Sequence, residues 1–369
     1  MSMDNANKQL HIAFFAGDIT QYWGTERVCT RIASALVQQH SHQVSIVSMF
    51  ENHKQSSFPL DTAITRHTLY SHEVHGVWRW PFTVARLLAF VRKEHIDILI
   101  DADGILDMYS LPVKLVTGVK IISWEHFNYL QHPDVPYRKV TRKLAAHYAD
   151  AIVTLTHQDA EFYQHYAHPK CPVVTIHNPI SLPPRPVAYD SNSHIIVSAG
   201  RLEPQKGFDM LIEAAKHVLP QHPNWQWVIL GEGSKRAELT AMIQEAHLEQ
   251  QLLLLGRVPN IDTWLSKASM FVLTSRFEGL PMVLLEAKSR KLPIVSFNCV
   301  TGPAEIVADT VNGYLVDCFD IQTFASKVNE LIENKQKRQQ FSEHALQGIE
   351  EFNITTIMNQ WQQLLECMA

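Results

Sequence analysis

Short apolar runs recur along this chain and alternate with segments that have helical periodicity, and this alternation constrains the fold more than any other feature. Several runs, such as 96–102 and 151–156, are almost continuously apolar, which is typical of parallel strands covered on both faces. Strands that alternate with helices predict βαβ units and a doubly wound parallel sheet. The candidate strands cover residues 11–17, 44–50, 96–102, 119–124, 151–156, 194–200, 225–231, 252–256, 270–275 and 292–297. The candidate helices cover residues 26–39, 208–218, 234–248, 281–290 and 321–334.

The runs fall into two series, and a proline-rich segment separates them. Residues 178–193 contain four prolines and several small polar residues, a composition typical of linkers. The sequence therefore predicts an α/β protein with two Rossmann-like domains, residues 1–185 and 186–351, that face each other across a cleft. Residues 352–369 carry apolar side chains at helical spacing, which predicts an amphipathic helix that packs on another element.

The composition supports two packed domains and excludes several classes of function. Of the 369 residues 46% are hydrophobic and 19% are charged, a balance typical of chains with sizeable cores. A formal net charge of -5 gives no global basic field, so nucleic acid is not an expected partner. The five cysteines are scattered without a CxxC pair, which indicates reduced thiols rather than disulfides or a zinc site. The chain starts without an apolar signal core and has no apolar run of transmembrane length, so we expect a cytoplasmic protein.

The segment FEGLPMVLLEA carries two glutamates, Glu278 and Glu286, with seven residues between them. Pro281 fits the first turn of a helix, which would place Glu286 about one and a half turns inside that helix. Glu278 and Gly279 would then lie on the entering loop, and free N–H groups near Leu280 would suit a phosphate. Carboxylates on either side could accept hydrogen bonds from the ribose and hexose of a nucleotide sugar. A solvated helix face is the alternative for the two acids.

A second segment, SAGRLEPQKG, places two cations directly after a candidate strand. Arg201 follows Gly200, where the strand ends, and Lys206 follows after four further residues. Ligands of doubly wound sheets bind at the carboxyl ends of the strands, so these cations are expected beside a ligand's phosphates. Arg can hold a phosphate with two parallel hydrogen bonds, and Lys adds a compact point charge. Surface charges that flank a turn would have the same pattern.

A third segment, residues 13–28, has the order strand, loop and helix. Its loop contains Gly17 and Gly24, and small loop residues let a ligand approach the backbone closely. Glu26 follows at the start of the helix, where a carboxylate also favours the helix dipole. The loop is equally consistent with ordinary turn chemistry.

Together with VILGEGSKRAEL, LLGRVPN and PAEIVADTVNGYLV, these segments resemble the signature blocks of retaining GT-B glycosyltransferases of family 4. The resemblance covers nearly all of residues 194–335 and extends more loosely to 1–180, through WGTERV and ISWEH. It implies a GT-B fold in which the first domain binds the acceptor and the second binds a nucleotide sugar. The tail helix would cross back to pack on the first domain.

The resemblance also implies residue roles in a retaining transfer that uses no metal ion or other cofactor. Arg201 and Lys206 would neutralise the donor diphosphate, and Glu278 would contact sugar hydroxyls. Glu286 would hold the ribose, and His126 would face the donor sugar. The other donor-binding residues would be Gly24, Gly279, Leu280, Arg257 and Val258, the last two meeting the base. UDP is the commonest nucleotide of the family, and the acceptor would be a glycan or lipid-linked glycan of bacterial surface polysaccharides.

Two further patterns have alternative interpretations. Asp101-Ala102-Asp103 spells a D-x-D, which holds a metal in other transferases, but it closes a candidate strand of the first domain. We interpret it as loop and helix-start chemistry. The stretch Trp78-Arg79-Trp80 and the segment 136–148 are basic and rich in aromatic residues, so they would suit the inner surface of an anionic membrane. A solvated helix face is the alternative. His126 could likewise be a histidine with a purely structural role at a strand end.

Two other functions remain open at this stage. A nucleotide-sugar epimerase or hydrolase of the same fold would need a site for an acid, a base or water in place of an acceptor. A protein that binds nucleotide sugars without turning them over would keep the same donor residues.

Overall fold

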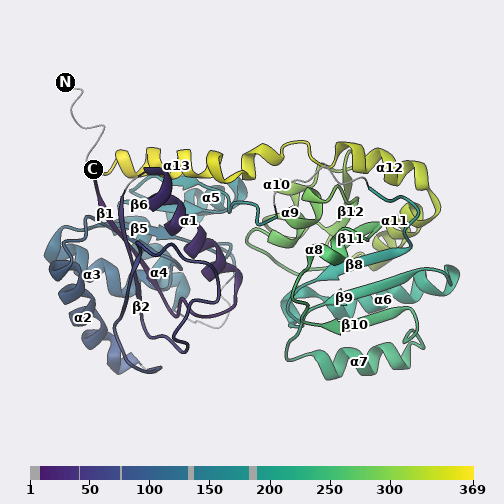
Figure 1. The fold of residues 1–369 in the computed structure, drawn as a ribbon, viewed down its shortest axis with the longest axis horizontal. Coiled ribbons are helices and arrows are strands. Elements are labelled where there is room, and N and C mark those ends of the chain that lie inside the picture. The colour runs from purple at the N-terminus through teal and green to yellow at the C-terminus, as the bar shows by residue number, and fades with distance from the viewer. Residues whose placement is uncertain (1–8, 41, 75–76, 132–136, 183–188) are drawn as a thin grey trace. The chain divides into compact units, whose positions relative to one another are not determined.

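The computed structural model describes residues 9–40, 42–74, 77–131, 137–182 and 189–369. The chain divides into two units (Figure 1). Unit 1 contains Met1–Pro179 and Ile354–Ala369, and unit 2 contains Ile180–Asn353. The domain boundary that the sequence placed at 185 lies outside the described residues, and the structure divides the chain a few residues before it.

Unit 1 contains a parallel seven-stranded sheet in the order β3-β2-β1-β4-β5-β6-β7. The central strand β1 pairs with β2 on one side and with β4 on the other, so the direction of winding reverses at β1. All residues of β1, β4 and β6 are buried, as expected for strands covered by helices on both faces. The strands are β1 (His11–Ala16), β2 (Gln43–Ser48), β3 (Thr65–Thr68), β4 (Ile98–Asp101), β5 (Lys120–Trp124), β6 (Ala151–Thr154) and β7 (Val173–Thr175).

Right-handed connections divide the helices of unit 1 between the two faces of the sheet. α3 packs against both α2 and α4, so these three helices form one layer, whereas α13 packs against α1. The α13 helix is held by Trp361, whose ring meets that of Trp124 edge-on at 5.1 Å, and by a 2.9 Å hydrogen bond between Gln362 and His42. The helices are α1 (Gly24–His40), η2 (Val77–Arg79), α2 (Trp80–Lys93), α3 (Asp107–Thr117), α4 (Arg138–Tyr148), α5 (His157–Phe162), η3 (Tyr163–Ala167) and α13 (Ile354–Glu366).

Unit 2 contains a parallel six-stranded sheet in the order β10-β9-β8-β11-β12-β13, and its winding reverses at β8. The strands are β8 (Ile195–Ala199), β9 (Gln226–Leu230), β10 (Leu252–Gly256), β11 (Met270–Leu273), β12 (Ile294–Phe297) and β13 (Gly313–Val316). The helices are η4 (Pro204–Lys206), α6 (Phe208–Val218), η5 (Leu219–Gln221), α7 (Arg236–Glu245), α8 (Asp262–Leu265), α9 (Met282–Ser289), α10 (Pro303–Ile306), α11 (Ile321–Glu333), α12 (Lys335–His344) and η6 (Ile349–Phe352). The two sheets confirm the predicted α/β class with two Rossmann-like folds.

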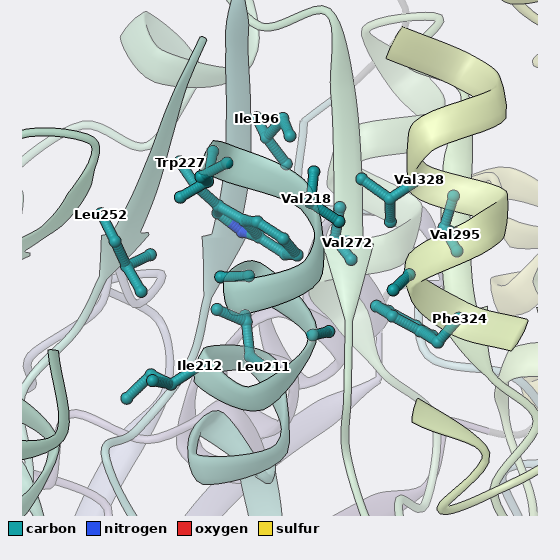
Figure 2. Close-up of a cluster of buried hydrophobic side chains, with 14 of the residues drawn as sticks. Ile196, Leu211, Ile212, Val218, Trp227, Leu252, Val272, Val295, Phe324 and Val328 are labelled. Carbon is teal, nitrogen blue, oxygen red and sulfur yellow. The ribbon is translucent and has the colours of Figure 1, made fainter. Parts of the chain in front are cut away.

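A large apolar cluster between the sheet and helices α6 and α11 forms the core of unit 2 (Figure 2). Trp227 of β9 is its largest fully buried side chain. The indole N–H of Trp227 donates to Ser198 Oγ at 3.0 Å, and that hydroxyl donates to Val272 O at 2.8 Å. Because its polar atom is satisfied in this way, the ring can be buried without an unpaired donor. This core holds β8 and β11 rigidly side by side, and the loops that follow them carry most of the predicted site.

No helix in the described part of the chain is both long enough and apolar enough to cross a bilayer.

Candidate functional site

The loop that follows β8 is fixed against the end of the neighbouring strand β11. Its 3₁₀ turn η4 ends at Lys206 and is followed by Gly207, which has a φ of 65°. A Cβ at Gly207 would lie 2.1 Å from Thr274 O, so only glycine permits this close approach. The hydroxyl of Thr274 also donates to Lys206 O at 3.2 Å. The position of Lys206 is therefore set by backbone contacts rather than by its own side chain.

This arrangement brings Lys206 into contact with Glu278, which lies in the loop between β11 and α9. Lys206 Nζ donates to Glu278 Oε1 at 2.6 Å, and the two side chains are 15% and 6% exposed. The loop of Glu278 is held by two hydrogen bonds: Thr301 Oγ1 donates to Glu278 O at 2.6 Å, and Gln205 Nε2 donates to Phe277 O at 3.1 Å. One predicted cation and one predicted acid, distant in sequence, thus form an ion pair at the carboxyl end of the sheet.

Arg201 lies at the same end of β8 and is exposed. Its guanidinium donates to Gln205 Oε1 at 3.5 Å. The stem of Lys206 passes over Gly200, since a Cβ at Gly200 would lie 3.2 Å from both Cγ and Cδ of Lys206. Both predicted cations therefore occupy the short segment between β8 and α6, one partly covered and one open to solvent.

The start of α9 lies in the same loop as Glu278. Pro281 has an extended backbone (φ -74°, ψ 93°) and is the N-cap residue, so the helix begins at Met282 and not at Pro281 as the sequence predicted. Because this ψ is not helical, Pro281 lies just outside the first turn of α9. Gly302 packs against this start: a Cβ there would lie 2.4 Å from Pro281 Cδ. The N–H groups of Met282 and Val283 have no acceptor within the helix, which is the arrangement that suits an anion.

Glu286 lies four residues after Met282, about 6 Å along the axis of α9. It is almost completely buried, as is Leu280, whereas Gly279 is half-buried. Leu280 can therefore offer a ligand only its backbone. Ser289 Oγ donates to Glu286 O at 2.6 Å and steadies the backbone of Glu286.

Arg257 and Val258 follow β10, which is the edge strand of the unit 2 sheet. Arg257 is exposed and Val258 is half-buried. Strand β9 separates β10 from β8, so these residues end at the same edge as Lys206 but roughly 10 Å away across the sheet. That displacement is suited to a group at the far end of a nucleotide.

His126 belongs to unit 1, where it follows β5 and packs on Trp124 with ring centroids 4.5 Å apart. Burial lowers the pKa of His126 to about 4, so the imidazole is neutral at neutral pH. Within the described part of the chain its Nε2 has no hydrogen-bond partner. A buried polar atom without a partner is rare and suits a ligand hydroxyl.

Gly24 is the first residue of α1 and is exposed, and a Cβ there would meet nothing within 4 Å.

A buried network of charges beside His126 was missed by the sequence analysis. Arg142 Nε donates to Glu125 Oε2 at 2.7 Å, and both side chains are completely buried. Arg138 is also buried and pairs with Asp103 through Nη2 and Oδ2 at 3.1 Å. The sequence had assigned Arg138 and Arg142 to a basic outer face, which is wrong because α4 turns them toward the sheet. Helical spacing placed Arg138 and Arg142 on one face, but the pattern alone did not show that this face was buried.

The D-x-D pattern belongs to this network. Asp101 is buried and accepts a hydrogen bond from Ser110 Oγ, whereas Asp103 binds Arg138 and accepts from Ile105 N at 3.2 Å. Asp103 thus makes a loop contact, as the sequence analysis expected, whereas Asp101 is the last residue of β4 and the N-cap residue of α3 is Leu106.

Asp209 and Arg276 form a second pair that the sequence analysis missed. Arg276 Nη1 and Nη2 donate to the two Asp209 oxygens at 2.8 and 2.6 Å, which ties α6 to the loop that carries Glu278. No local spacing indicates such a pair, because its members lie on different segments of the chain.

Two family models match the chain, one for each half of the sequence. Residues 23–182 match the model described as Glycosyltransferase Family 4, and residues 184–347 match the model described as Glycosyl transferases group 1. The chain belongs to the family 4 glycosyltransferases. The second match contains the Lys206–Glu278 pair and the start of α9, and the first contains Gly24 and His126.

Relatives of this glycosyltransferase match it along almost its whole length. The amylovoran biosynthesis glycosyltransferase AmsD of Erwinia amylovora is 28% identical over 356 residues, which cover 94% of this chain and 97% of AmsD. An α-1,4-N-acetyl-D-galactosaminyltransferase of Campylobacter jejuni, named for an acceptor on PP-undecaprenol, is 25% identical over 354 residues, covering 93% and 94%.

The solved structures confirm the predicted GT-B fold. A structure of S. aureus TarM with bound UDP has a TM-score of 0.80 to this chain at 16% identity, covering 96% of this chain and 99% of TarM.

Proposed function

We propose that this glycosyltransferase transfers a hexose or N-acetylhexosamine from a UDP-sugar to a glycan or lipid-linked acceptor, with retention of configuration and without a metal ion. The observation that carries the proposal is the Lys206–Glu278 ion pair beside the start of α9. The pair and the helix start lie at one edge of one sheet, where they would offer a cation to phosphate, an acid to sugar hydroxyls and free N–H groups to an anion.

The hard step of such a transfer is the departure of the nucleoside diphosphate. Negative charge grows on the bridging phosphate oxygen as the bond to the sugar breaks. Lys206, Arg201 and the N–H groups at the start of α9 would stabilise that charge, and they are already in position before the donor binds. Lys206 is held by Gly207 and Thr274, so little reorganisation accompanies the reaction.

The acidic residues would fix the two ends of the donor. Glu278 would accept hydrogen bonds from hydroxyls of the transferred sugar, and Glu286 would accept them from the ribose. Arg257 and Val258 would meet the base. The acceptor hydroxyl would attack from the face that the leaving group vacates and pass its proton to the departing phosphate. His126 and Gly24, to which the family resemblance gives contacts with the donor sugar, belong to unit 1.

The acceptor class is proposed from the relatives. AmsD is named for the biosynthesis of amylovoran, and the Campylobacter enzyme is named for an acceptor on PP-undecaprenol. TarM was solved with UDP. By the same reasoning we place the reaction in bacterial surface polysaccharide biosynthesis, on the cytoplasmic side of the membrane.

A product assay tests this proposal. The full chain is incubated with UDP-glucose, UDP-galactose and their N-acetyl counterparts, with and without diphosphoundecaprenol-linked sugars, in the presence of EDTA. We expect release of UDP only with an acceptor, and an α-linked product by NMR from an α-linked donor. Release of UDP without an acceptor would indicate a hydrolase, and a changed sugar still attached to UDP would indicate an epimerase. Tight UDP binding without turnover of any donor would identify a binding protein, and loss of activity in EDTA would overturn metal independence.

A further inference from the structure

Two aromatic side chains of unit 1 are exposed on the loop that joins β1 to α1. Tyr22 is 54% exposed and Trp23 is 44% exposed. The ring of Tyr22 stacks on that of Phe58, which lies between β2 and β3, with centroids 4.9 Å apart and 27° between the ring planes. Rings left in water lose the free energy that burial of their apolar area would supply. We call Tyr22, Trp23 and Phe58 the aromatic shelf.

Buried polar residues hold the backbone of the shelf in one position. The Asp18 carboxylate accepts hydrogen bonds from Thr20 N at 2.9 Å and from Asn52 N at 3.2 Å. Thr20 joins the same two segments, because its hydroxyl accepts from His53 N at 3.2 Å and its carbonyl accepts from Ser57 Oγ at 2.5 Å. Asp18 and Thr20 are both buried. The aromatic rings therefore project from a preorganised loop, so a ligand that stacks on them pays little ordering entropy.

A carboxyl group lies beside the shelf, in the first turn of α1. Arg27 N donates to Trp23 O at 3.2 Å, so this turn starts at Trp23. Residues three apart lie on the same side of a helix, which places Glu26 next to Trp23. Within the described part of the chain, Glu26 Oε2 is buried and has no hydrogen-bond partner. A buried acceptor without a donor is rare and suits a hydroxyl of a ligand.

The shelf lies at the carboxyl edge of the unit 1 sheet, where the winding reverses at β1. Doubly wound sheets bind their ligands at such a point. His126 follows β5 at the same edge, and β4 separates β5 from β1, so the ends of β5 and β1 lie roughly 10 Å apart. That separation suits two linked or adjacent sugar rings, one near His126 and the next on the shelf.

We propose that the aromatic shelf binds a pyranose ring of the acceptor glycan. The C–H groups on one face of a pyranose pack on the electron-rich face of Tyr22 or Trp23, and a hydroxyl at its rim donates to Glu26. Two half-exposed rings offer on the order of 200 Å² of apolar area, which suits one sugar, whereas a stable protein interface buries about 1,200 Å² or more. That the sugar belongs to the acceptor rests on the proposed function, whereas its chemical class rests on the shelf itself.

Saturation-transfer difference NMR on the full chain tests this proposal without turnover. The probes are the methyl glycosides of glucose, galactose and their N-acetyl counterparts, each in millimolar excess. We expect saturation transfer to the C–H protons on one ring face of at least one glycoside. Trp23→Ala and Tyr22→Ser should each weaken glycoside binding about fivefold, and Glu26→Gln about threefold. In the transfer assay, Trp23→Ala should raise KM for the acceptor and leave kcat unchanged.

Exposed aromatic residues elsewhere in unit 1 serve as matched controls. Trp78→Ala and Tyr148→Ser remove rings that are at least as exposed as those of Trp23 and Tyr22, and neither should change glycoside binding. The affinity for UDP should be the same in the shelf variants and the controls. A chain that binds a glycoside through the shelf but transfers no sugar would contradict the proposed function and support the shelf. Absence of saturation transfer to every glycoside, or undiminished transfer in Trp23→Ala and Tyr22→Ser, would overturn the proposal.

Discussion

The sheets of the two units begin with the same strand order, in which the first strand is central and the winding reverses beside it. At the carboxyl ends of these strands, however, the two units differ. Unit 1 carries buried acids and arginines at this edge, and some of them pair with one another, as Glu125 and Arg142 do. Unit 2 keeps close backbone approaches at Gly207 and Gly302, one partly exposed ion pair, and the exposed Arg201.

This difference separates charges that hold the fold from charges that can bind a ligand. A buried pair whose hydrogen-bonding groups are all used contributes to stability only while both partners are present. The guanidinium of Arg142 already donates to Glu125 and to the carbonyl oxygens of Tyr129 and Gln131, so it has little capacity for a substrate. Lys206 has three donor hydrogens and gives one of them to Glu278, which leaves donors for a phosphate. We therefore expect a ligand at the carboxyl edge of the unit 2 sheet, whereas Glu125 and Arg142 in unit 1 hold the fold.

The largest effect should come from breaking the structural pair of unit 1. We expect Arg142→Met to lower the free energy of unfolding by about 3–5 kcal/mol, because the buried Glu125 loses its closest cation and keeps only Arg138 at 3.4 Å. Chemical denaturation measures this. Arg236→Met is the matched control, since its pair with Glu232 is exposed and worth at most about 0.5 kcal/mol. Equal losses of unfolding free energy in Arg142→Met and Arg236→Met would show that the buried pair of unit 1 stabilises the fold no more than an exposed pair of unit 2.

The next effect should appear in catalysis rather than stability. We expect Lys206→Ala to reduce turnover about 10²- to 10³-fold, because one preorganised donor to the leaving diphosphate is lost. Lys216→Ala removes an exposed lysine of the same unit and should leave turnover unchanged. Turnover near that of the wild type in Lys206→Ala would exclude the proposed role of this residue.

We expect the protonation of His126 to make the free energy of unfolding depend on pH. Its pKa is about 4 in the folded chain and near 6.5 when unfolded, so the unfolded chain binds the extra proton between these values. Stability is therefore lost as pH falls from 6.5 to 4, by about 3 kcal/mol in total. The stability of His126→Gln should lack this loss over the same range, so the difference in unfolding free energy between the two proteins should change by about 3 kcal/mol. Parallel curves would show that burial does not suppress the charge of His126.

The smallest effect concerns Glu26, the half-buried carboxyl at the start of α1. Burial, reinforced by the carboxylates of Asp18 and Asp103, raises the pKa of Glu26 to about 7. Ionisation then destabilises the folded chain, so stability is lost as pH rises from 4.5 to 7. We expect the wild type to lose about 1–2 kcal/mol more than Glu26→Gln over this interval, a figure reduced for partial exposure. An identical pH dependence in the two proteins would contradict the raised pKa.

The strands were easiest to predict where burial on both faces makes their sequence continuously apolar. The ten predicted strands all occur, and the helix predicted at 208–218 matches α6. Strands β3, β7 and β13 were not predicted from the sequence. Strand β3 has the sequence TRHT and lies at the edge of its sheet, and β7 has only three residues and also lies at an edge. An edge strand has one neighbour and less burial, so its sequence need not be apolar.

The candidate site was predictable to the extent that its residues lie within short motifs. FEGLPMVLLEA indicated that Glu278 and Glu286 flank a helix start, and the structure differs only at Pro281. The contacts that give the site its shape join separate motifs, as Gly207 meets Thr274 and Thr301 meets Glu278. Local spacing carries no information about such contacts. The same limitation hid the burial of Arg142, because an amphipathic pattern does not state which face is covered.

The binding of UDP to the full chain, measured by calorimetry, tests most directly whether unit 2 uses its sheet edge to hold a nucleoside diphosphate. The account predicts that the wild type binds UDP and that Lys206→Ala binds it at least about tenfold more weakly, because a hydrogen bond to a charged group is lost. Equal affinity in the two proteins, or no binding of UDP, GDP or ADP by the wild type, would contradict it.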